Sequence, residues 1–397
     1  MVVDGPKKDL SSGAGASGPA RRPAARRLTP FFVAVLTVLA ASAFVAARWV
    51  VAAQGDLSRF VVAGSDFVSP GAGIAVRPGP GYDGQFAYRL ALDPTDLAPR
   101  DHGVAIDSPL RLQRITYPVL AFLASGGRQG AVPAALVVVN VLGLGLLALL
   151  SALLARDAGR QPVAGLLVVG FFGFCTSLGR DLTEITTVTF LVAGVLAWQR
   201  GRPVLAVLAF SAAVLSRESA LLLYAAFVLV QLTGMTRRTR LLALLPLLAF
   251  AGWQVVCTAA TGDIPMLSSG GKNLGLPLRD LVPAGGGWFG DAARLDRAGL
   301  ITSGQLLALG VLVAAAGLSL RRSLAPRGVQ AAWVVALLLV VSLSSNVWRG
   351  PADFRTAAEL QAASAVLLLD SRLSLRVPAT FMTAALLMTV LFRVISL

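Results

Sequence analysis

The chain alternates long apolar blocks with short segments rich in arginine. One block, AALVVVNVLGLGLLALLSALLA, runs from residue 134 to 155 without a charged side chain. Blocks of about 20 apolar residues have the length that a helix needs to cross a bilayer. The pattern predicts spans near 30–53, 131–155, 163–178, 183–198, 203–215, 218–233, 240–260, 303–320, 329–345, 355–370 and 377–395. We therefore expect an all-α polytopic membrane protein with about eleven transmembrane helices.

The composition supports a membrane protein over a soluble one. Of the 397 residues, 56% are hydrophobic and 14% are charged. A soluble domain of this size carries roughly 25% charged residues. A large buried soluble core would not need so many apolar blocks of this length.

The basic residues predict an orientation in the membrane. Residues 1–29, expected to be a disordered basic tail, and five arginine-rich connections between spans hold 18 of the 35 Lys and Arg but 4 of the 20 Asp and Glu. Short basic loops mark the cytoplasmic side of a membrane. We expect a plasma-membrane protein with a cytoplasmic N-terminus. This explains the net charge of +15 without nucleic-acid binding.

Two long polar segments interrupt the apolar pattern of the transmembrane domain, 30–397. The first, 54–130, is an outer loop with short helices expected at 84–93 and 114–124. Both are too short to cross a membrane, and we expect them to lie on the membrane surface. The second, 261–302, contains GGGWFGD and is a candidate lid, in which Trp288 would stack on a sugar. An ordinary flexible loop at the membrane interface remains an equal alternative.

The first candidate for chemistry is GYDGQFAYRLALDP, residues 81–94. Asp83 opens a short amphipathic helix, and a helix N-terminus keeps a carboxylate ionised. Such a group is suited to take a proton from an acceptor hydroxyl. The alternative is a helix cap without catalytic function. Tyr82 and Gln85 are expected to contact the substrate.

The second candidate is an acidic pair in SLGRDLTEIT. Asp181 and Glu184 are three residues apart and would share a helix face if the helix began at Asp181. They are expected to orient Asp83 or, together with Asp83, to hold a divalent cation, which is the one cofactor that the sequence suggests. The alternative is a capping pattern at the start of the next span.

Three arginines are candidates for binding a phosphate. Arg217 stands beside Glu218 between apolar runs, where charges are costly and are usually functional or paired. Arg349 and Arg355 lie in SSNVWRGPADFRTAAEL. A guanidinium can bind phosphate through two hydrogen bonds. The alternatives are local ion pairs, Arg217 with Glu218 and Arg355 with Glu359 at i,i+4 spacing.

Few other residues suggest a reaction. Cys175 and Cys257 are expected to be free buried thiols, with a bridge between them as the alternative. His102 is the only histidine, which excludes a zinc site built on several histidines. The sequence contains no Walker loop, serine-hydrolase elbow or CxxC motif.

The layout and two stretches resemble the GT-C superfamily of integral membrane glycosyltransferases. YDGQFAYRLALDP and DSPLRLQRITYPVLAFLA look most like a set of bacterial, mainly actinobacterial, membrane proteins of this type. The resemblance covers most of the spans by layout and about 45 residues by motif. It implies that Asp83 is the catalytic base and that Asp181 and Glu184 correspond to the second-loop acids of some members.

These observations lead to one functional expectation and two alternatives. We expect an inverting glycosyltransferase that moves a sugar from a polyprenyl-phosphate donor to a cell-envelope glycan, lipid or protein on the outer face of the membrane. Asp83 would act as general base, and Arg217 with Arg355 or Arg349 would bind the phosphate. The alternatives are a transporter or flippase of lipid-linked sugars and a non-catalytic membrane scaffold.

Overall fold

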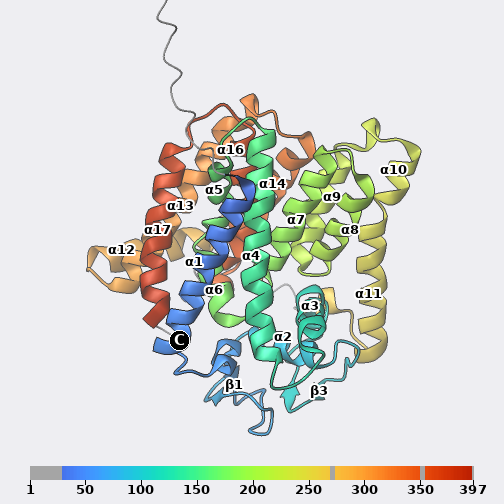
Figure 1. Ribbon diagram of the computed structural model, residues 1–397, viewed down its shortest axis with the longest axis vertical. Coiled ribbons are helices and arrows are strands. Elements are labelled where there is room, and N and C mark those ends of the chain that lie inside the picture. The colour runs from blue at the N-terminus through green and yellow to red at the C-terminus, as the bar shows by residue number, and fades with distance from the viewer. Residues whose placement is uncertain (1–28, 269–272, 349–353, 396–397) are drawn as a thin grey trace, which may run out of the picture.

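The computed structural model describes residues 29–268, 273–348 and 354–395, which form a bundle of helices (Figure 1). The helices are α1 (Pro30–Val51), α2 (Gly84–Leu92), α3 (Thr116–Ser125), α4 (Val132–Asp157), α5 (Leu166–Val169), α6 (Gly173–Arg180), α7 (Glu184–Gln199), α8 (Pro203–Val214), α9 (Glu218–Leu229), α10 (Arg237–Leu242), α11 (Leu245–Thr261), α12 (Leu281–Ala293), α13 (Arg297–Ser319), α14 (Arg327–Val341), α15 (Ser345–Trp348), α16 (Ala358–Leu369) and α17 (Arg376–Ile395). Short 3₁₀ turns are η1 (Leu57–Val61), η2 (Pro109–Arg111), η3 (Pro162–Gly165), η4 (Leu232–Gly234), η5 (Pro265–Leu267), η6 (Leu320–Arg322) and η7 (Arg355–Ala357).

The long apolar helices make this chain a membrane protein. Five helical segments in the described residues are long and apolar enough to cross a bilayer: 30–51, 132–157, 237–261, 297–319 and 376–394. A sixth is the bent pair 162–169 and 173–180, whose halves meet at 67°. The predicted span 163–178 is therefore broken, at the Gly170 position where α5 ends.

Shorter helices form the middle of the bundle. The helices α7, α8, α9, α14 and α16 have 12 to 16 residues, so each extends about 18–24 Å, which is less than the bilayer's hydrocarbon thickness of about 30 Å. They occupy the predicted spans at 183–198, 203–215, 218–233, 329–345 and 355–370. The existence of helices there is confirmed, while the count of eleven full spans stays a prediction.

Residues 54–130 fold into a small unit at one end of the bundle, the lower end in Figure 1, which we term the loop end. Strand β1 (Ala63–Gly64) pairs in parallel with β2 (Val76–Arg77), and β3 (Arg100–Asp101) pairs antiparallel with β4 (Val104–Ala105). Two buried tyrosines attach the helices of this unit. Tyr88 on α2 donates a hydrogen bond to the Ala72 carbonyl, and Tyr117 on α3 donates one to the Leu136 carbonyl of α4.

The two short helices predicted in this segment are confirmed as α2 and α3, but the expected environment of α2 is wrong. All nine of its residues are buried between the loop unit and the bundle. The helix therefore does not lie free on a membrane surface, because its polar residues have protein partners.

The arginine-rich connections meet at the opposite end of the bundle. Arg160 donates hydrogen bonds to the carbonyls of Leu368 and Leu369 at the end of α16, and Arg200 pairs with Asp157 at 2.8 Å. Connections that are distant in sequence are thus neighbours in space. Cys175 and Cys257 are both buried, and no disulfide joins them, so the alternative of a bridge between them is not realised.

Candidate functional site

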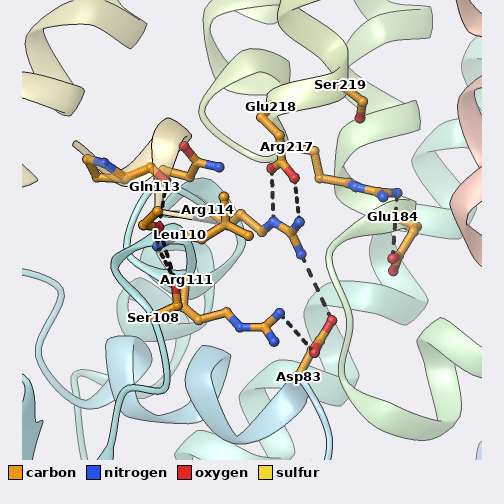
Figure 2. A network of polar contacts seen from close by, with 12 residues as sticks. Asp83, Ser108, Leu110, Arg111, Gln113, Arg114, Glu184, Arg217, Glu218 and Ser219 are labelled. Carbon is orange, nitrogen blue, oxygen red and sulfur yellow. Dashed lines mark hydrogen bonds and ion pairs between the residues drawn. The ribbon is translucent and has the colours of Figure 1, made fainter. Parts of the chain in front are cut away.

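Charged side chains from five parts of the chain converge at the loop end. Asp83 precedes α2, Arg111 and Arg114 flank the turn from η2 to α3, and Glu184 begins α7. The remaining members come from the start of α9 and from η7 and α16: Arg217, Glu218, Arg355 and Glu359. Figure 2 shows Arg111 and Arg114 pointing toward Asp83, and Arg217 pointing toward Glu184.

A glycine brings the start of α2 close to the end of α6. A Cβ atom on Gly84 would lie 2.3 Å from the Arg180 carbonyl oxygen and 2.7 Å from that of Val61. Only glycine lets the backbone at the start of α2 approach the end of α6 this closely. The glycine next to Asp83 therefore places that carboxylate beside the connection from α6 to α7.

Asp83 occupies the capping position of α2 but does not cap it. Its side chain makes no capping hydrogen bond. Instead Oδ1 lies 2.9 Å from Nη1 of Arg111, and Oδ2 lies 2.8 Å from Nη2 of Arg355 and 3.9 Å from Nη1 of Arg114. The capping alternative for Asp83 is therefore not supported by the geometry.

The arginines decide the protonation of Asp83. Burial by itself would raise the pKa of this carboxyl, but the guanidinium groups of Arg355, Arg111 and Arg114 outweigh it and hold the pKa far below its usual range. Opposite charges within a few ångströms favour the ionised form. Asp83 is therefore a carboxylate, and while its arginines remain in place it is a weak proton acceptor.

Arg355 also reaches the next carboxylate inward. Its Nη1 lies 2.6 Å from Oε1 of Glu184, which is almost fully buried and accepts a second hydrogen bond from Ser177 at 3.0 Å. One guanidinium thus joins the loop before α2 to the start of α7, although 272 positions separate Arg355 from Asp83.

Arg217 lies in the innermost part of the cluster. Its Nη1 is 3.6 Å from Glu184 and 3.4 Å from Glu359, and Ser219 donates a hydrogen bond to Glu359 at 2.7 Å. Neighbouring Glu218 faces another way and binds Arg114 through both oxygens, at 3.0 and 2.5 Å. The predicted alternatives are therefore wrong: Arg217 does not pair with Glu218, nor Arg355 with Glu359.

A small cavity, which we term the loop-end cavity, lies at the centre of this cluster. It measures about 30 Å³ and is lined by Asp83, Phe86, Ala87, Leu90, Arg111, Arg114, Asp181, Leu182, Thr183 and Arg355. This volume has room for about one or two water molecules, so a sugar could enter only if the surrounding groups separate. Asp83 is paired with Arg111, Arg114 and Arg355 at this cavity, an arrangement that we term the closed state.

A second cavity lies deeper among the short helices, and we term it the apolar cavity. It measures about 50 Å³ between α7, α8, α9, α14 and α16. Glu359, the partner of Arg217, is the one charged residue among its lining residues. The apolar cavity therefore lies next to the charged cluster, on the side of the cluster that faces the interior of the bundle.

The structure brings together Asp83, Asp181, Glu184, Arg217 and Arg355, the five residues predicted to share one site. Asp181 and Glu184 do not share a helix face, because α6 ends at Asp181 in a left-handed conformation (φ 52°) and α7 begins at Glu184. No group of three Asp, Glu, His or Cys side chains that could hold a metal ion occurs in the described ranges. Arg355 lies between Asp83 and Glu184, at the place where the sequence suggested a divalent cation bound by these acids.

The other predicted site residues lie around the cluster. The ring of Tyr82 contacts the guanidinium groups of Arg180 and Arg355, whose central carbons lie 4.4 and 5.0 Å from the ring centre. Gln85 holds the preceding loop through Gly64 and Pro80.

Trp288, on α12, packs against Trp348 and Phe354, with ring centres 6.2 and 5.3 Å away. It does not line the loop-end cavity. Arg349 lies outside the described residues.

Sequence reasoning missed Arg111 and Arg114 as site residues. Both stand in the stretch that carried the family resemblance, three residues apart. Their spacing indicates nothing by itself, because η2 and α3 are separate elements. The available signal was two arginines close together in a segment expected on the outer face.

Comparisons with known proteins identify the fold. The chain is similar to the crystal structure of ArnT from Cupriavidus metallidurans bound to undecaprenyl phosphate, with 13% identity and a TM-score of 0.51 over 87% of this chain and 61% of the ArnT chain. The apo structure of the same protein has 14% identity, the same coverage and a TM-score of 0.48. No family model and no curated protein matches the sequence. The chain thus shares the membrane fold of ArnT, as an all-α polytopic protein, and it spans about 61% of the ArnT chain's length.

Proposed function

We propose that this protein is a membrane glycosyltransferase that moves a sugar from a polyprenyl-phosphate donor to a cell-envelope acceptor. The observation that carries the proposal is the contact of Asp83 with Arg111, Arg114 and Arg355 in a cavity at one end of a GT-C fold. A carboxylate beside several guanidinium groups supplies both a proton acceptor and binding groups for a phosphate.

The proposed reaction is a single displacement. The acceptor oxygen attacks the anomeric carbon of the sugar as its hydroxyl proton passes to Asp83. The bond from that carbon to the phosphate oxygen breaks, the polyprenyl phosphate leaves with the bonding electrons, and the configuration at the anomeric carbon inverts. Arg355 and Arg217 stabilise the negative charge that develops on the leaving phosphate. Arg111 and Arg114 join them in this proposal, and the role of Arg349 stays a prediction.

Donor binding would also activate the base. In the closed state the guanidinium groups of Arg355 and Arg111 contact Asp83 and keep its pKa low. A phosphate group competes for the same guanidinium groups, because it accepts charge-assisted hydrogen bonds in the same geometry. As the arginines turn to the phosphate, the pKa of Asp83 rises, and the carboxylate accepts a proton only once the donor is in place.

The lipid part of the donor has a matching environment. The apolar cavity reaches Glu359, which lies 3.4 Å from Arg217. An isoprenoid chain attached to a phosphate at Arg217 would extend along the apolar cavity into the bilayer. We propose that the site faces away from the cytoplasm in the plasma membrane, because the arginine-rich connections gather at the opposite end. A divalent cation remains a prediction.

The test is transfer by the purified full chain in liposomes that also contain a cell-envelope lipid and glycan extract. Undecaprenyl-phosphate-linked sugars, radiolabelled in the sugar, serve as donors, and the label that leaves the donor is measured. We expect transfer by the wild type and a loss of at least 100-fold in Asp83→Asn, since general base catalysis contributes about 10²–10⁴-fold.

The matched control is Asp66→Asn, the same chemical change at an exposed acid of the loop unit, which should keep wild-type transfer. Wild-type transfer by Asp83→Asn would contradict the base assignment. Movement of intact labelled lipid across the bilayer without transfer would favour a flippase.

A further inference from the structure

Asp181 is a buried carboxyl without a hydrogen-bond partner. Its side chain is fully buried, and within the described part of the chain neither Oδ1 nor Oδ2 has a hydrogen-bond partner. It lies in the connection between α6 and α7 and lines the loop-end cavity. Its backbone is left-handed, at φ 52°, a conformation that costs a non-glycine residue free energy.

The arginines and Asp83 that line this cavity offer a ligand no free carboxyl oxygen as a hydrogen-bond acceptor. Arg111, Arg114 and Arg355 can only donate hydrogen bonds. Asp83, the other carboxylate of the lining, is engaged at Oδ1 by Arg111 and at Oδ2 by Arg355. Asp181 is therefore the carboxyl in the lining that is available to accept a hydrogen bond from a molecule entering the cavity.

An unpartnered buried carboxyl is costly, because burial removes its hydration without giving it a hydrogen bond. Burial raises the pKa of Asp181 well above its usual range, and the positive charge of Arg48 offsets this effect only in part. Buried polar groups of this kind are uncommon, and a specific instance needs a physical reason. A ligand that donates hydrogen bonds supplies one. A sugar presents several such donors, either hydroxyl groups or an ammonium group, whereas a phosphate without a proton presents none.

We propose that Asp181 accepts a hydrogen bond from a hydroxyl or ammonium group of the transferred sugar and thereby selects the donor by its sugar. This inference rests on the proposed function. It divides the loop-end cavity into two parts. The arginines recognise the phosphate of every polyprenyl phosphate, while Asp181 distinguishes a glycosylated lipid from the bare one. Asp181 is thus a specificity residue, separate from the proton transfer at Asp83.

The experiment compares two classes of ligand on the detergent-solubilised full chain. Affinities are measured for undecaprenyl phosphate and for a panel of undecaprenyl-phosphate-linked pentoses, hexoses and amino sugars. We expect the wild type to bind at least one glycosylated lipid more tightly than the bare lipid. In Asp181→Leu, which removes the acceptor oxygens at similar side-chain size, this lipid should bind about tenfold more weakly, the size of one lost hydrogen bond, while the affinity for undecaprenyl phosphate stays within about twofold.

The outcomes separate the two proposals. A wild type that prefers no glycosylated lipid would overturn this inference, whereas the proposed function is overturned by the absence of transfer in the liposome assay. If the wild type shows a preference and Asp181→Leu keeps it, only the role of Asp181 is wrong. Equal weakening of both ligands would mean that Asp181 is structural, and unchanged binding of the bare lipid shows that the variant is folded. Asp66→Leu serves as the matched control, at an exposed acid of the loop unit.

Discussion

At the scale of single residues, Arg355 connects the two halves of the site. It pairs with Asp83 at 2.8 Å and with Glu184 at 2.6 Å. Glu184 has almost no contact with solvent, so the ionised form of its carboxylate depends on its protein partners. Removing one partner from a buried ion pair leaves an uncompensated charge, which costs more than the pair itself contributes.

This predicts the stability of variants at Arg355. Arg355→Met should lower the free energy of unfolding by about 3–5 kcal/mol, the usual cost of breaking a buried pair. The double variant Arg355→Met with Glu184→Gln should recover part of the loss, because the stranded charge is gone. Thermal unfolding in detergent measures both. Arg294→Met, at an exposed arginine, is the control, and an Arg355→Met protein as stable as that control would show that the network contributes little.

At the scale of elements, α12 contacts the segment that positions Arg355. Trp288 packs edge-to-face on Phe354, and Phe354 adopts a left-handed conformation (φ 49°) immediately before Arg355. This conformation is unusual for a bulky residue and persists only where the surroundings hold it. The aromatic cluster of Trp288, Trp348 and Phe354 is the surrounding that does so.

Two accounts of Trp288 therefore make different predictions. If it stacks on a sugar, as the sequence suggests, Trp288→Ala weakens binding of glycosylated lipids alone. If it supports Phe354 and Arg355, the variant weakens undecaprenyl phosphate and glycosylated lipids by similar factors and melts at a lower temperature, and Trp288→Phe restores much of both. The packing favours the second outcome. A selective loss for glycosylated lipids would contradict it.

Sequence reasoning succeeded within elements and failed between them. The place of Asp83 at the start of α2, between Gly81 and Gly84, was predictable, because the helix and its end before Pro94 are local features. The spacing of Arg355 and Glu359 was misleading, because i,i+4 pairing requires one continuous α-helix and Arg355 lies in the turn η7 before α16. The partners of Arg111 and Arg114 depend on tertiary packing, which no local pattern encodes.

At the scale of the whole molecule, the charge pattern and the fold agree. The connections predicted to share one face of the membrane meet at one end of the bundle, and the charged cluster lies at the other (Figure 1). Hydropathy located the helices but could not give their lengths, because short buried helices and full spans are equally apolar. The helical membrane fold that the chain shares with ArnT could be inferred from layout and one motif, whereas the closed state of the site could not.

The central claim is that the arginines of this site bind the phosphate of a polyprenyl phosphate. The most direct measurement is a cryo-electron microscopy structure of the full chain with undecaprenyl phosphate. We predict the phosphate within hydrogen-bond distance of Arg355 and Arg217, the contact of Arg355 with Asp83 opened, and the isoprenoid on the side of the apolar cavity. A phosphate bound elsewhere, with Arg355 still joining Asp83 to Glu184, would contradict the account.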